Sequence, residues 1–179
     1  PMGEFTGKGD YFEADLKREK KPKLSIAGAY NLNDRAARQK QTGVFLSDTN
    51  GTYLSRSIIT LFADLVFKYR GFSLSAEYAY RDLIFQNGET IATIESEIVD
   101  GDGNTYHTGS GFVLQVGHLF KNNFEIAGRY TTVTPSWNGS FSGKNEYTLG
   151  VSKYVVGHSL KIQSDITLID EFWIKDPSL

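Results

Sequence analysis

The 179-residue chain contains no cysteine, which excludes disulfide frameworks, thiol catalysis and cysteine-ligated zinc together. Neither sign of charge predominates, because 19 Lys and Arg are balanced by 21 Asp and Glu. The basic surface of a nucleic-acid-binding protein is therefore not expected. No stretch approaches 18 consecutive apolar residues, which excludes a transmembrane helix. Only four prolines accompany 18 glycines, 12 Phe and 10 Tyr, a composition that favours β-strands joined by tight turns.

Signatures of catalysis are equally scarce. The histidines His107, His118 and His158 lie far apart, and neither an H-E-x-x-H motif nor a glycine-rich phosphate loop is present. Ser110 lies in G-S-G and not in a G-x-S-x-G elbow. We therefore expect neither enzymatic activity nor a cofactor; a Ser-His-Asp site assembled across a barrel wall remains the alternative.

What is present is a period-two alternation of apolar and polar residues, typical of strands. Phe72, Leu74 and Ala76, for example, alternate with Ser73 and Ser75. Each such run has one apolar face and one polar, often charged, face. The pattern predicts eight strands in a single domain, over 10–17, 23–32, 59–68, 72–81, 109–120, 124–131, 145–155 and 160–168.

The connections between these strands alternate in length. Short turns fall at Arg18–Pro22, Arg70–Gly71, Lys121–Asn123 and Val156–Ser159, and long polar loops at 35–57, 83–108 and 132–144. Short turns at one end and long loops at the other are typical of an antiparallel transmembrane β-barrel in a bacterial outer membrane. A soluble barrel, with its apolar face turned inward, would show the same alternation.

Aromatic residues favour the membrane interpretation. Tyr69 and Phe72 flank one short turn, and Phe120 and Phe124 flank another. The opposite strand ends carry tyrosines on the apolar face, namely Tyr30, Tyr80, Tyr130 and Tyr147. Aromatic belts at both rims suit a wall that contacts lipid and lipopolysaccharide. His118 and Lys153, near short turns on the same face, are expected to extend toward lipid headgroups.

The predicted order of turns places the start of the first strand and the end of the eighth at the long-loop end. Outer-membrane barrels keep both termini at the short-turn end, so residues 1–179 are expected to be one region of a larger barrel. A misplaced short strand at one end is the alternative, and it would restore a complete small barrel.

Three stretches resemble the phosphate-selective porin O/P family of outer-membrane channels: GFSLSAEYAYRD (Gly71–Asp82), FEIAGRYTTVTP (Phe124–Pro135) and NEYTLGVSKYVVGHSLKIQSDITL (Asn145–Leu168). The last resembles the penultimate hairpin of that family, which one more strand and an aromatic C-terminus would follow. The resemblance implies a sixteen-stranded barrel, of which this chain is the C-terminal half without its last strand. Trimers are common in the family.

The polar face supplies the candidate pore-lining residues, because a porin selects by width and by lumen charge. If Arg70–Gly71 is a two-residue turn, Asp64 faces Glu77, which is either a cation-attracting spot or a solvated pair. The candidates are of mixed sign, namely Glu13, Asp15, Lys17, Asp64, Lys68, Glu77, Arg81, Glu125, Arg129, Lys161 and Asp165. No basic cluster is evident among them, so anion or phosphate selectivity is implied by the resemblance alone.

The loops hold weaker candidates. Asp100, Asp102 and Asn104 have the 1-3-5 spacing of a calcium loop, but Thr105 stands where an EF-hand needs Gly, which favours an ordinary turn. Asn50-Gly51 predicts a hairpin turn. The basic stretch 35–41 either faces lipopolysaccharide or folds into the pore, and the sequence does not say whether 35–57 or 83–108 folds inward.

The function expected from the sequence is a porin that passes small hydrophilic solutes, anions such as phosphate among them. Two alternatives remain open. One is a non-conducting barrel within an outer-membrane protein assembly, with partners bound by its long loops or by the basic turn 17–23. The other is a complete eight-stranded barrel with a packed interior.

Overall fold

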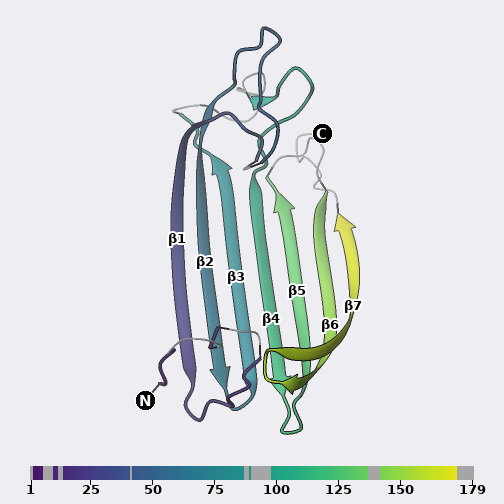
Figure 1. Cartoon of the computed structure of the whole chain (residues 1–179). Coiled ribbons are helices and arrows are strands. Elements are labelled where there is room, and N and C mark those ends of the chain that lie inside the picture. The colour runs from purple at the N-terminus through teal and green to yellow at the C-terminus, as the bar shows by residue number, and fades with distance from the viewer. Residues whose placement is uncertain are drawn as a thin grey trace.

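The computed structural model describes residues 2–5, 10–11, 14–40, 42–86, 89, 98–136 and 142–172. Its regular elements are seven strands that form one antiparallel sheet in sequence order (Figure 1). They are β1 (Lys23–Ala36), β2 (Arg56–Tyr69), β3 (Phe72–Leu83), β4 (Gly109–Leu119), β5 (Phe124–Pro135), β6 (Gly143–Val156) and β7 (Leu160–Phe172). Within these residues, no helix is long and apolar enough to cross a membrane.

Seven of the eight predicted strands are confirmed, as is the alternation of short turns with long loops. The β2–β3 hairpin has the predicted register, with Asp64 opposite Glu77. Its two-residue turn needs a left-handed backbone at both positions, and Arg70 and Gly71 have φ angles of 51° and 88°. A Cβ atom on Gly71 would lie 2.6 Å from the carbonyl oxygen of Leu119, so only glycine fits there.

The prediction of a strand over 10–17 is wrong for the residues that the structure describes. These residues form turns, because the Asp15 carboxylate accepts hydrogen bonds from the backbone amides of Glu19 and Gly71, which an extended strand could not arrange. As a result β1, and not an earlier strand, follows the turn near Arg18–Pro22. It starts at the short-turn end, so the expectation that the first strand starts at the long-loop end is also wrong.

The apolar face of the sheet is largely uncovered. Leu24, Leu65 and Ile126 belong to it by register, and it carries no layer of helix or second sheet in the described residues. Large side chains exposed on this face are Leu24, Ile26, Tyr30, Leu32, Leu61, Tyr78, Phe124, Ile126, Tyr147, Leu149, Val151, Ile162, Ile166 and Leu168. An apolar surface spread over so many strands normally marks an interaction site.

The buried apolar clusters of the described residues lie at the two ends of the polar face. At the long-loop end, Ile58 and Leu83 of the sheet pack with Leu46, Ile98 and Tyr106 of the loops. At the short-turn end a smaller cluster consists of Ala14, Leu119 and Tyr154. The middle of the polar face is hollowed and not filled by a core.

β1 and β7 form the two edges of the sheet, and neither pairs with the other among the described residues. A single parallel bridge, Gly3 to Lys23, lies beside the start of β1. The seven strands therefore form an open curved sheet and not a closed barrel.

Candidate functional site: the polar face

The structure brings together most of the predicted pore-lining residues. Strand register places eight of them on the polar face, namely Asp64, Lys68, Glu77, Arg81, Glu125, Arg129, Lys161 and Asp165. Asp15 and Lys17 precede β1, and Glu13 lies outside the described residues. The polar face is mixed in character, because Phe62 and Val133 are also exposed on it.

The described residues of the loops 35–57 and 83–108 pack over the long-loop end of this face. The Tyr106 hydroxyl donates hydrogen bonds to the carbonyl oxygens of Ala36 and Leu54, at 2.9 and 3.0 Å, and so joins the two loops. Burial raises the pKa of this hydroxyl. Asn50 and Gly51 form the predicted hairpin turn at the tip of the first loop, with φ of 80° at Gly51. The described residues of both 35–57 and 83–108 therefore pack against the polar face of the sheet.

The packing of the first of these loops against the polar face creates a basic groove that the sequence did not reveal. Its volume is about 840 Å³, and the charged residues that line it are all cationic: Arg35, Arg38, Lys40 and Arg81. We refer to these four residues as the basic groove. The Arg38 guanidinium lies 4.0 Å from the centre of the Phe45 ring, and Arg81 has a buried Nε without a hydrogen-bond partner. Cations this close together raise the local affinity for anions.

His107 lies beside the basic groove. Its backbone amide donates a hydrogen bond to the carbonyl oxygen of Gln39. Burial lowers the pKa of His107, and the positive charges of Lys40 and Arg81 lower it further. The ring is therefore held in its neutral form near pH 7, since the ordinary value is already below that.

The part of the polar face at the centre of β2 and β3 is acidic. A hollow of about 510 Å³ is lined there by Asp64 and Glu77, and no cationic side chain shares this lining. The two carboxylates face each other directly across the β2–β3 ladder, as the sequence predicted. Asp64 and Glu77 thus form an acidic patch on β2 and β3, next to the cations of the long-loop end, whereas the hollow over β4 to β7 combines Arg129 with Glu125 and Asp165.

Replacing Asp64 by Asn should stabilise the sheet, because directly opposed like charges in a ladder repel. We expect D64N to raise the free energy of unfolding by about 0.2–1 kcal/mol, measured by circular dichroism in detergent. D165N is the matched control, since Asp165 faces Gly150 and no carboxylate. A destabilised D64N chain with reduced cation permeability would contradict this and favour a cation-attracting spot.

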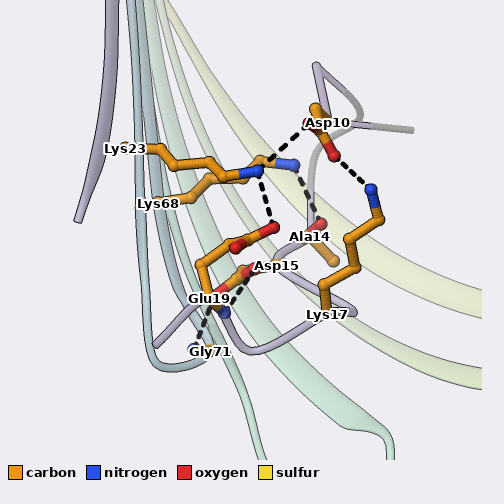
Figure 2. Close-up of polar contacts among 8 residues, drawn as sticks. All are labelled: Asp10, Ala14, Asp15, Lys17, Glu19, Lys23, Lys68 and Gly71. Atoms are coloured by element: carbon orange, nitrogen blue, oxygen red, sulfur yellow. Dashed lines mark hydrogen bonds and ion pairs between the residues drawn. The ribbon is translucent and has the colours of Figure 1, made fainter. Parts of the chain in front are cut away.

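The short-turn end carries a network of buried charges, drawn in Figure 2. Lys23 forms ion pairs with Asp10 and Glu19, at 3.1 and 2.9 Å, and Asp10 also pairs with Lys17. Lys68 donates a hydrogen bond to the carbonyl oxygen of Ala14 at 3.1 Å. The side chains of Asp10, Lys23 and Lys68 are nearly inaccessible to solvent, so the segment before β1 is anchored to the first two strands by desolvated charge.

The same segment reaches the later strands. Asp15, which is 1% exposed, accepts the Gly71 amide at 2.8 Å, and Arg18 donates to the carbonyl oxygen of Phe120 at 2.6 Å. Tyr154 of β6 packs with Ala14 and donates to Glu125 at 2.8 Å. Residues 10–11 and 14–20, hereafter the N-terminal segment, therefore contact the short-turn end from β1 to β6. Sequence analysis missed this role; the only signal for it was the run of charges in 10–23.

On the opposite face, Lys153 and His118 lie where the sequence placed them. Lys153 pairs with Phe124, and its ammonium lies 4.3 Å from the centre of that ring. It also donates to the carbonyl oxygen of Asn122, in a short turn. The His118 ring contacts Phe120 edge-on at 5.0 Å between centroids. The Lys153 ammonium therefore covers an aromatic ring at the end of the strands, as a cation–π contact does.

The weak calcium candidates form a turn closed on itself. Asp100 Oδ1 accepts the amides of Asp102 and Asn104, and the Asn104 side chain donates to Asp100 Oδ2 at 3.0 Å. These bonds occupy the carboxylate that a calcium ion would need. Across the ranges that the structure describes, no group of three or more His, Asp or Glu is close enough to hold a metal ion.

Comparison with known proteins adds nothing to this geometry, because no family model, curated protein or solved structure matches the chain.

Proposed function

We propose that this sheet is part of the wall of an outer-membrane β-barrel, and that the barrel is a water-filled channel for passive diffusion of small hydrophilic solutes. The observation that carries the proposal is the opposition of its two faces. One face exposes large apolar side chains on most of its strands, and the other is hollow and charged. Lipid outside and water inside match that opposition.

The exposed apolar face supports a lipid contact more than a protein core. A soluble sandwich or barrel buries its apolar face, yet Ile26, Tyr30 and Ile166 are 69%, 62% and 74% exposed. Those values come from strands at both edges of the sheet, and Leu149 of β6 follows the same trend. Hydrocarbon around the sheet would cover this surface without a second layer of protein.

The basic groove supports a preference for anions, phosphate among them. Four cations converge where the long loops fold over the polar face, and the lining contains no carboxylate. In a channel, such a site raises the local anion concentration at the entrance. Its extracellular placement follows from the proposal, since the long loops of these barrels face outward.

The resemblance to the phosphate-selective porin O/P family extends the proposal to a sixteen-stranded barrel. A barrel of that size is wide enough to leave an aqueous channel at its centre. The outer edges of β1 and β7 pair with no further strand among the described residues, and there further strands would join. Lipid, lipopolysaccharide and other copies of the chain are the partners that such a barrel would contact.

The second candidate, a non-conducting barrel subunit of an outer-membrane assembly, is favoured by one observation. Buried clusters and folded segments cover both ends of the polar face, which narrows any passage. Planar-bilayer conductance of the native protein separates the two. We expect discrete channels that carry chloride in preference to potassium. Absence of channels together with a stably co-purifying protein would favour the second candidate.

A further inference from the structure

The N-terminal segment contacts strands that are far apart in the sheet, which a turn between neighbouring strands does not require. It lies across the short-turn end of the polar face, whereas an ordinary periplasmic turn would only link two neighbouring strands (Figure 1). Its contacts reach polar-face residues on three different strands, Lys68 of β2, Leu119 of β4 and Tyr154 of β6. Whatever passes along that face must pass this segment.

We propose that the N-terminal segment is a plug that closes the short-turn end of the channel and opens when its ionic latch is released. This inference rests on the proposed channel function and adds to it a regulated exit. The latch is the two ion pairs that Lys23, at the start of β1, forms with Asp10 and Glu19 of the segment (Figure 2). The ion pair of Asp10 with Lys17 lies within the segment.

Two features distinguish this segment from a permanent part of the wall. It contributes no strand to the sheet in its described residues, so its removal breaks no ladder. Its apolar contact is small, since Ala14 and Leu16 are its members of the short-turn cluster. Polar contacts therefore dominate its attachment, and polar contacts between groups that can be rehydrated are reversible.

Because the latch consists of ion pairs, loss of charge on its carboxylates is the change that would open it. Neutralising Asp10 and Glu19 leaves Lys23 without the carboxylates that share its buried site, where it is 6% exposed. An ammonium in that position is more stable in water, and it reaches water when the segment lifts away.

The test uses the absence of cysteine from the chain. A single thiol at position 14 reports whether the segment is seated, because Ala14 is 1% exposed where the segment packs on Leu119 and Tyr154. A thiol at the exposed Lys20 is the control within the same segment. In vesicles, we expect a water-soluble thiol reagent to label A14C slowly and K20C fast. D10N/E19Q should accelerate A14C labelling by on the order of tenfold and raise single-channel conductance.

Two further variants serve as a control for the loss of charge and as a substitute if the first variant does not fold. D34N/E146Q also neutralises two carboxylates in ion pairs, those with Arg35 and Lys144, away from the N-terminal segment, and should leave A14C labelling unchanged. K68M removes the hydrogen bond to Ala14 while it keeps the acidic residues, and should reproduce faster labelling if D10N/E19Q does not fold.

Labelling of A14C as fast as K20C in the parent chain would overturn the plug, because the segment would not be seated. Faster labelling in D10N/E19Q without a rise in conductance would also overturn it, since the segment would not obstruct the channel. A lack of conductance from every variant, with the labelling pattern as expected, would instead refute the channel function and leave the segment a structural clamp.

Discussion

Replacing Ile166 by arginine should lower the free energy of unfolding in lipid vesicles by about 2–4 kcal/mol. Ile166 lies at the centre of β7 on the apolar face and is 74% exposed. In water so exposed a site would tolerate arginine with a change within about 0.5 kcal/mol. At the bilayer midplane the guanidinium would have to leave water for hydrocarbon, and the free energy of that transfer is the expected loss of stability. Denaturant unfolding followed by circular dichroism measures it.

The neighbouring position supplies the control. Thr167 has the same depth in β7 but points to the polar face, where it pairs with Thr148. T167R should therefore change the free energy of unfolding in vesicles by less than about 1 kcal/mol. Equal effects of I166R and T167R would show that the apolar face does not contact lipid, and would remove the main support for the outer-membrane proposal.

The double substitution R38Q/R81Q should lower the chloride-to-potassium permeability ratio of the channel by roughly fivefold at low salt. Both guanidinium groups line the basic groove. Each removed charge weakens the attraction of an anion about 8 Å away in water by about 0.5 kcal/mol, so the two together account for about 1 kcal/mol, or roughly fivefold. The Debye length is about 10 Å at 0.1 M salt and becomes shorter as the salt concentration rises. The change in the permeability ratio should therefore shrink at higher salt. Reversal potentials across a salt gradient measure the ratio.

A matched pair of charges outside the groove is the control. R70Q/K121Q also removes two cations, but these lie in the short turns after β2 and β4, at the other end of the sheet. Its ratio should stay near that of the parent channel. If both double variants lower the ratio equally, net charge and not the basic groove would determine selectivity.

The sequence by itself determined seven of the strands and the register of the β2–β3 hairpin. Alternation over 72–81 and 124–131 requires one apolar face, and a one-residue slip would place that face on the wrong side. The Arg70–Gly71 turn then fixed Asp64 opposite Glu77, as found. These features are local, and local patterns are legible without knowledge of the rest of the chain.

Only the tertiary structure decided how the two ends of the polar face are built. Arg81 lies more than forty residues from Arg38 in the chain, so their meeting depends on how both loops pack around Leu46 and Tyr106. The N-terminal segment has the residue alternation of a strand, yet its Asp15 accepts a hydrogen bond from the backbone amide of Gly71, in a turn distant in sequence. Buried charge takes whichever partners the fold brings near, and no sequence period encodes that choice.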